Sequence, residues 1–227
     1  MITQSLSHRV KLLVFALVSV AVLVLSYVGY SALETFQQLH VVEADRDQWQ
    51  RPSDVIQALG LKTGDVVVDL GCGSGYFTLK VSPSVGRRGR VVAEDIRRLP
   101  LIFLWLRAVA RHDHNIDVTL GTADDPRLPM GVNTVLISNT YHEFSDPHSI
   151  LVHVYNSLVP GGTLVIIDRE PKLPTSPALD LADHEISAQV VESDLRRVNF
   201  EIVSEQDNFV TQDSYGETWW LLRARKP

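Results

Sequence analysis

The chain has 227 residues, a formal net charge of -6 and a sequence pI near 5.7. Broad nucleic-acid binding requires a clustered basic surface, so this acidic composition excludes nucleic acid as a general partner. Cys72 is the only cysteine, which excludes a disulfide framework and a cluster of thiolate metal ligands, and we predict no metal site.

Residues 10–30 form an apolar segment whose one charge, Lys11, lies at its edge. A row of about 19 apolar or small residues matches the span of a bilayer core, so we predict that residues 1–33 form a membrane anchor. A cleaved signal peptide is the alternative, with Arg9 and Lys11 as its basic region. We favour the anchor because the apolar run is longer than in most signal peptides and no clear cleavage site follows it.

Residues 34–60 are predicted to form a linker and then a helix that caps the domain. Pro52 suits the first turn of such a helix, and Gly60 suits its end. Apolar residues at helical spacing between them predict one buried face. Residues 61–227 are sufficient for one α/β domain with a full hydrophobic core.

The segment VVVDLGCGSG, residues 66–75, predicts a strand followed by a tight turn and the start of a helix. Its run of β-branched residues is typical of a strand that is buried on both faces of a parallel sheet. Gly71, Gly73 and Gly75 allow a sharp turn and a close approach of the backbone to a ligand. The spacing is GxGxG, whereas nicotinamide dinucleotide folds have GxGxxG, because Tyr76 occupies the next position.

With an acid two residues before the first glycine, this segment resembles motif I of the class I S-adenosylmethionine-dependent methyltransferases. The resemblance implies an α/β fold with a doubly wound, mostly parallel seven-stranded sheet and an antiparallel C-terminal strand over residues 61–227. It also implies S-adenosylmethionine as the cofactor. The loop residues that the resemblance assigns to cofactor binding are Asp69, Gly71, Cys72, Gly73 and Gly75.

Residues 89–96, GRVVAEDI, predict a second buried strand that ends in two acids. Asp95 follows Gly75 by 20 residues, the spacing at which a carboxylate in such folds accepts hydrogen bonds from the ribose hydroxyls. Glu94 is the alternative, but alternation along the strand aims the two side chains differently. The alternative is that no cofactor binds here and that the two acids are exposed side chains at a strand end.

Residues 97–112 predict a helix that is more apolar than covering one side of a sheet requires, with arginines around its apolar surface. This pattern is typical of a basic helix that lies in a membrane interface. A wide core-facing stripe and a homodimer contact are the alternatives.

The loop GTADDPRLP, residues 121–129, has Thr122 where the methyltransferase family often has an aspartate that binds the adenine amino group. This departure leaves the adenine contact to other groups. We expect Asp124 to replace that contact, with the main-chain amide of Ala123 or of Asp124 bound to the edge of the adenine ring.

Residues 134–144 predict the fourth strand and the loop after it, at the sheet edge where open α/β folds bind ligands. We assign Asn139 to the cofactor, and Tyr141 and Glu143 to the substrate side. His142 is the candidate general base, because an imidazole near neutrality accepts a proton from a hydroxyl or thiol. A purely structural bond from His142 to a backbone carbonyl is the alternative.

Two further residues complete the predicted site. His184 is the competing base, in the region after the fifth strand, and Trp49 lies where the capping helix would reach cofactor or substrate. Trp49 packing its helix onto the core is the alternative. The segment LVPGGTLVIID, residues 158–168, predicts the fifth strand, and a proline-rich loop at residues 170–177 is expected to border the substrate.

The sequence therefore predicts a membrane-associated methyltransferase that acts on a small-molecule or lipid-like acceptor. A tethered regulatory module that binds the cofactor without turnover is one alternative, and another transferase on the same scaffold is the second. We expect a single-pass or monotopic anchor. The positive-inside rule places the domain outside the cytoplasm, but the cofactor is made in the cytosol, so we favour the cytosolic side.

Overall fold

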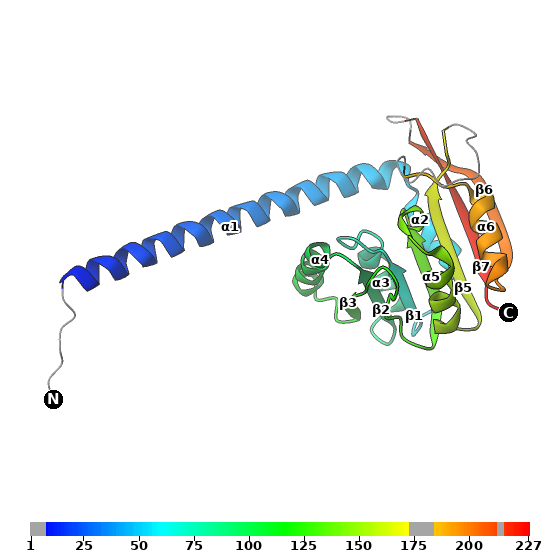
Figure 1. The fold of residues 1–227 in the computed structure, drawn as a ribbon, viewed down its shortest axis with the longest axis horizontal. Coiled ribbons are helices and arrows are strands. Elements are labelled where there is room, and N and C mark those ends of the chain that lie inside the picture. Colours follow the sequence, from blue (N-terminus) through cyan, green and yellow to red (C-terminus); the bar gives the residue numbers. More distant parts are fainter. Residues whose placement is uncertain (1–7, 173–183, 213–215) are drawn as a thin grey trace. The chain divides into compact units, whose positions relative to one another are not determined.

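The computed structural model describes residues 8–172, 184–212 and 216–227 (Figure 1). The chain divides into two compact units, residues 1–48 and residues 49–227, and each is considered by itself. Most of the proline-rich loop expected at the substrate lies outside the described residues.

The described residues of the first unit belong to one long helix, α1 (His8–Trp49), of 42 residues, without a buried residue; its last residue, Trp49, is the first of the second unit. Its length and apolar composition suffice for one membrane crossing, a property that N-terminal signal sequences share. The linker predicted from residue 34 is instead helical up to Trp49. No glycine or proline occurs between residues 30 and 51, so nothing in the backbone ends the helix before Pro52.

Helix α2 (Pro52–Leu59) begins and ends where the sequence predicts. Pro52 occupies its first turn, and Arg51 before it adopts a left-handed conformation with φ 51°. Gly60 ends the helix with φ 63° and donates its N–H to the carbonyl of Gln57. Val55 and Leu59 are buried against the domain core.

The second unit contains a seven-stranded sheet in the order β3-β2-β1-β4-β5-β7-β6. Strands β1 to β5 are parallel, and β7 is antiparallel to both of its neighbours, which confirms the predicted mostly parallel sheet. The strands are β1 (Val66–Leu70), β2 (Arg90–Asp95), β3 (Ile116–Leu120), β4 (Val132–Ser138), β5 (Leu158–Arg169), β6 (Glu201–Gln212) and β7 (Glu217–Arg225).

Helices cover both faces of this sheet. Val67 and Val68 are neighbours on β1 but belong to opposite core clusters, because successive strand residues point to opposite faces. Val67 packs with α2 and α3, whereas Val68 packs with α5 and α6. The connecting helices are α3 (Thr78–Val85), α4 (Arg98–Arg111), α5 (Pro147–Ser157) and α6 (Ala188–Arg197), with a short 3-10 turn η1 (Tyr141–Glu143) after β4.

Candidate active site

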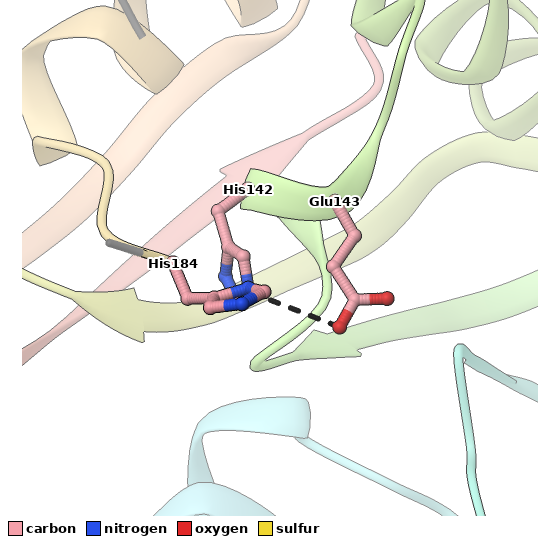
Figure 2. Close-up of side chains that lie close together, drawn as sticks. All are labelled: His142, Glu143 and His184. Atoms are coloured by element: carbon pink, nitrogen blue, oxygen red, sulfur yellow. Dashed lines mark ion pairs between the residues drawn. The ribbon is translucent and has the colours of Figure 1, made fainter. Parts of the chain in front are cut away.

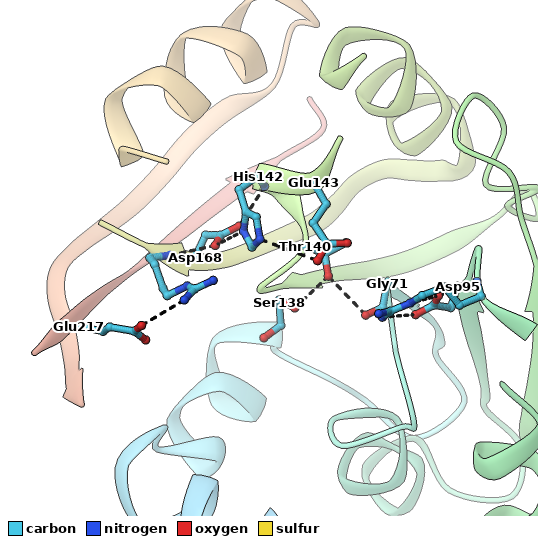
Figure 3. A network of polar contacts seen from close by, with 10 residues as sticks. Gly71, Asp95, Ser138, Thr140, His142, Glu143, Asp168 and Glu217 are labelled. Carbon is cyan, nitrogen blue, oxygen red and sulfur yellow. Dashed lines mark hydrogen bonds and ion pairs between the residues drawn. The ribbon is translucent and has the colours of Figure 1, made fainter. Parts of the chain in front are cut away.

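The carboxyl ends of β1, β2, β4 and β5 meet at one edge of the sheet. Leu70 at the end of β1 is paired with Glu94 on β2 and with Ile137 on β4. The register therefore brings together the glycine loop, the acids that end β2, the turn after β4 and the end of β5. Figure 3 shows the polar network that runs along this edge.

The three loop glycines have different reasons for lacking a side chain, although all have positive φ. A Cβ on Gly71 would lie 2.2 Å from Thr140 Cγ2, and a Cβ on Gly75 would lie 2.3 Å from Leu104 Cδ1. A Cβ on Gly73 would have no heavy atom within 4 Å. Gly71 and Gly75 are therefore required by packing, whereas Gly73 borders open space in which a ligand fits.

Asp69 on β1 and Cys72 in the glycine loop are both buried side chains. The buried Asp69 carboxylate accepts a hydrogen bond of 2.5 Å from the Thr78 hydroxyl, which fixes the start of α3 against β1. Cys72 is also buried, and its burial raises the pKa of the thiol well above the usual value. The thiol is therefore protonated at neutral pH, which excludes a thiolate nucleophile in the loop.

Asp95 ends β2 with a buried carboxylate that faces the glycine loop. One oxygen accepts the Gly73 N–H at 2.9 Å, and the other accepts the Arg97 N–H at 2.8 Å. The Arg97 guanidinium also approaches Asp95, at 3.2 Å. Arg97 is a site residue that the sequence analysis did not identify, because one arginine among several in this segment has no distinguishing pattern.

Glu94 precedes Asp95 on β2 and is also buried. Its carboxyl group lies beside Gly121, where a Cβ would come within 1.9 Å of Glu94 Oε1, and among the described residues this oxygen has no hydrogen-bond partner. Burial raises the pKa of Glu94 from 4.5 to about 8, so the group is mostly neutral at pH 7.

Glu94 should make stability depend on pH. Because its pKa is about 8 when folded and 4.5 when unfolded, its contribution is fully present below pH 4.5 and is lost as the pH rises through 8. We expect Glu94→Gln to remove this loss, which is of the order of 3 to 5 kcal/mol at most. Urea denaturation at pH 5.5 and 8.5 measures it, with exposed Glu201→Gln as the control. An equal fall in parent and Glu94→Gln would contradict the assignment.

The end of β4 offers two acceptor oxygens to a ligand. Among the described residues, Ser138 Oγ and Asn139 Oδ1 are buried without a hydrogen-bond partner. Asn139 adopts a left-handed conformation with φ 55°, and its N–H donates to the carbonyl of Ile167 on β5. Because buried polar atoms are normally satisfied, these oxygens fit the donors of a bound molecule.

His142 on η1 has a carboxylate partner. Its Nδ1 lies 2.8 Å from Oδ1 of Asp168, and its backbone N–H donates to Oδ2 at 3.3 Å. Asp168, the residue before the last one of β5, is fully buried and also accepts the Arg169 N–H. This arrangement favours a proton on Nδ1 and leaves the lone pair of Nε2 for other groups. The predicted alternative, a bond from His142 to a backbone carbonyl, is replaced by this carboxylate.

Nε2 of His142 faces two other candidate residues. Glu143 Oε1 lies 3.9 Å from it, and the ring centres of His142 and His184 are 5.3 Å apart. The structure therefore brings the two predicted bases and one predicted substrate residue together, although 41 residues lie between His142 and His184.

Two predicted substrate residues are placed elsewhere. Tyr141 is fully buried in the core, and its hydroxyl donates to Asp194 on α6 at 3.0 Å, so its prediction as a pocket wall is corrected. Its neighbour His142 is turned to the sheet edge because adjacent residues of the 3-10 turn point in different directions. Trp49 packs against Trp219 with ring centres 5.4 Å apart, as the structural alternative predicts.

The predicted adenine contacts lie on an exposed loop. Thr122 closes this loop, because its N–H donates to the Asp125 carbonyl and its hydroxyl accepts the Asp125 N–H. Ala123 and Asp124 are exposed at the tip. Their prediction as adenine contacts is not tested by this geometry.

Comparison with known proteins agrees with this fold and site. The sequence model of the ubiE/COQ5 methyltransferase family matches residues 35–192. The chain belongs to this family. The match confirms the resemblance to class I methyltransferases, and S-adenosylmethionine is accordingly the cofactor that the site has to fit.

Two curated members of the family illustrate the similarity. The C-methyltransferase UbiE of ubiquinone and menaquinone biosynthesis from Hydrogenovibrio crunogenus is 28% identical over 53% of this chain and 47% of its own. The 2-phytyl-1,4-naphtoquinone methyltransferase of Thermosynechococcus vestitus is 32% identical over 48% of each chain. The chain thus spans about half the length of these relatives.

A solved structure supports the fold. A SAM-dependent methyltransferase from Aquifex aeolicus superposes with a TM-score of 0.65 and 24% identity, over 78% of this chain and 89% of that one. S-adenosylmethionine has hydroxyl and ammonium donors. The open space at Gly73, the Asp95 carboxylate and the side-chain oxygens of Ser138 and Asn139, which have no partner in the described part of the chain, fit this chemistry.

Proposed function

We propose that this protein transfers a methyl group from S-adenosylmethionine to a small lipophilic acceptor with an acidic hydroxyl group, such as a reduced quinone. The observation that most strongly supports turnover is the His142–Asp168 pair, at 2.8 Å, on the same sheet edge as the glycine loop. The acceptor class is supported by the names of two relatives, one a C-methyltransferase of ubiquinone and menaquinone biosynthesis and the other a 2-phytyl-1,4-naphtoquinone methyltransferase.

Some residues of the site would bind the cofactor, and others would remove a proton from the acceptor. Asp95 accepts from the ribose hydroxyls, Gly73 leaves room for the methionyl part, and the oxygens of Ser138 and Asn139 accept from its ammonium group. When bound, the cofactor supplies an electrophilic methyl group on its sulfonium. The remaining task of the protein is to align the acceptor and to remove its proton.

His142 is suited to that proton transfer. Asp168 orients the ring through Nδ1, so Nε2 accepts the hydroxyl proton of a quinol as the methyl group is transferred. Loss of this proton would make the neighbouring ring carbon more nucleophilic, which favours formation of a carbon–carbon bond to the methyl group as the bond between sulfur and methyl breaks and S-adenosylhomocysteine leaves. The hydrogen on that ring carbon would then be lost as a proton while the oxygen regains one, which restores the aromatic quinol. The proton ends on Nε2, and the Asp168 carboxylate stabilises the resulting imidazolium.

An exposed apolar face on α4 supports membrane association. Leu101, Leu104 and Ala108 bury one side of this helix, as a core-facing helix requires. The other side exposes large apolar residues with 53% to 64% of their surface in solvent: Leu99, Ile102, Trp105 and Val109. Such a face, flanked by arginines, is typical of a helix that lies in a lipid interface, and a homodimer contact is the alternative.

We propose that α1 anchors the chain in a membrane with the second unit on the cytosolic side. The apolar part of α1 is long enough for one crossing. The basic residues before it favour the opposite orientation, but access to the cofactor requires the cytosolic side. A reporter fused to the C-terminus measures the orientation directly.

Deleting residues 1–30 tests the role of the membrane. We expect unchanged affinity for the cofactor, because the glycine loop and Asp95 belong to the second unit. Turnover of a long-chain naphthoquinol in vesicles should fall at least tenfold, while turnover of its short-chain soluble analogue should not change. The double variant Ile102→Ser and Trp105→Ser changes the exposed apolar face of α4 and leaves α1 intact. It therefore measures the contribution of that face separately from the contribution of the anchor. Equal activity of the deletion on both acceptors would contradict membrane recruitment.

Binding without turnover is the second candidate function. It is favoured by Thr122, which replaces an aspartate that the family often has and here closes its own loop instead. Incubation with membrane extract and detection of S-adenosylhomocysteine distinguishes the two functions. Accumulation of this product, with a methylated acceptor identified by its mass, supports the enzyme, and cofactor binding without product supports the module.

A further inference from the structure

Three potential metal ligands meet beside the acceptor end of the site, as Figure 2 shows. His142 and Glu143 come from η1, and His184 comes from the segment before α6. Each offers one ligand atom, and these atoms all lie within 4.8 Å of one another. The sequence analysis predicted no metal site, because the ligand pattern arises only when the fold joins positions 142 and 184.

The donor set indicates the kind of ion. Two imidazoles and one carboxylate suit a borderline divalent ion such as Zn²⁺ or Co²⁺, whereas Mg²⁺ and Ca²⁺ prefer oxygen ligands. Bonds of about 2.0 to 2.2 Å place neighbouring ligand atoms roughly 3 to 3.5 Å apart. Glu143 and His184 are exposed, so rotation of their side chains closes the remaining distance without moving the backbone.

His142, the remaining ligand, is already held in one orientation by its neighbours. His142 is buried, and Asp168 holds its Nδ1 at 2.8 Å, which turns Nε2 toward Glu143. A carboxylate on the far nitrogen of a ligating histidine is the arrangement that orients the ring and strengthens it as a donor. Arg169, which follows Asp168, is paired with Glu217 at 3.1 Å, so its positive charge is offset by that carboxylate.

We propose that His142, Glu143 and His184 form a binding site for one divalent transition-metal ion of the Zn²⁺ class. Three protein ligands leave at least one open position on the ion. An oxygen of the acceptor can take that position, a consequence that rests on the proposed function. The site itself does not, because its binding test contains neither cofactor nor acceptor. With the ion bound, Nε2 of His142 is a ligand and cannot accept a proton, so the base role proposed above belongs to the metal-free site.

Titration calorimetry on the full chain in detergent, without a histidine tag and after treatment with a chelator, tests the site with Zn²⁺ alone. We expect one equivalent to bind with micromolar or tighter affinity. Glu143→Gln and His184→Ala should each weaken binding at least tenfold, the effect expected when a ligand is lost. Both side chains are exposed, so the fold should be retained, and circular dichroism checks this.

A second histidine pair provides the matched control. His112 and His114 are both exposed, with ring centres 6.3 Å apart and no hydrogen bond between them. His114→Ala should leave the Zn²⁺ affinity unchanged. In the Co²⁺-loaded parent we expect visible absorption bands that His184→Ala removes. Equal affinity of parent and His184→Ala, loss of binding in His114→Ala, or no saturation below about 1 mM Zn²⁺ would each overturn the proposal.

Discussion

His142→Ala should lower turnover by about a hundredfold or more while leaving cofactor affinity unchanged. The lost rate is that expected when a positioned general base is removed. The affinity should survive because His142 bonds to Asp168 on β5, whereas the proposed cofactor groups lie on the glycine loop, on β2 and at the end of β4. Single-turnover assays with excess chelator measure this effect without a contribution from a bound metal ion.

Asp168→Asn provides a second measure of the same pair. An asparagine keeps the size of the side chain but removes the charge that stabilises the imidazolium, so turnover should again fall strongly. His153→Ala, at a partly exposed position on α5, is the matched control and should keep the parent rate. If His142→Ala retains near-normal turnover between pH 6 and 9, the base is His184 or the reaction needs none.

Gly73→Val should abolish measurable binding of S-adenosylmethionine. The new side chain would enter the open space beside the loop, where the methionyl part has to lie. Asp95→Ala removes an acceptor of charge-assisted hydrogen bonds, each worth roughly 1.5 to 3 kcal/mol, so affinity should fall about ten- to a hundredfold. Calorimetry with the cofactor measures both variants.

Gly131→Val is the control for backbone strain. Gly131 has φ 82° and, like Gly73, no heavy atom within 4 Å of an added Cβ, but it precedes β4 at the opposite end of the strand. Its variant should bind the cofactor as the parent does. Parent-like affinity in both Gly73→Val and Asp95→Ala would show that the cofactor site is elsewhere.

Local sequence signals predicted the central strands because β1, β2 and β4 contain short apolar runs followed by turn residues. The alternation of Val67 and Val68 between two core clusters shows why a continuous apolar run was sufficient to predict burial on both faces. The position of Asp95 followed from its distance to the glycine loop. The apolar runs and the spacing of Asp95 both depend on residues that are close together in the sequence. They could therefore be predicted without knowledge of the fold.

Contacts between segments that are far apart in the sequence could not be predicted from local patterns. Asp168 was visible as the end of a strand, but nothing near it in the sequence indicates that its carboxylate meets His142. Tyr141 was assigned to the pocket because it is next to His142, yet the geometry of η1 turns it into the core toward Asp194. The extent of α1 was missed because polar residues in a helix that is exposed throughout give no apolar periodicity.

Because the chain has a single thiol, opening of the glycine loop can be followed by chemical labelling. Cys72 is buried in that loop, and its raised pKa keeps it protonated while the loop is closed. A maleimide can react only after the loop opens and exposes the sulfur. The labelling rate of the unaltered protein therefore measures how often this loop opens, without any introduced probe.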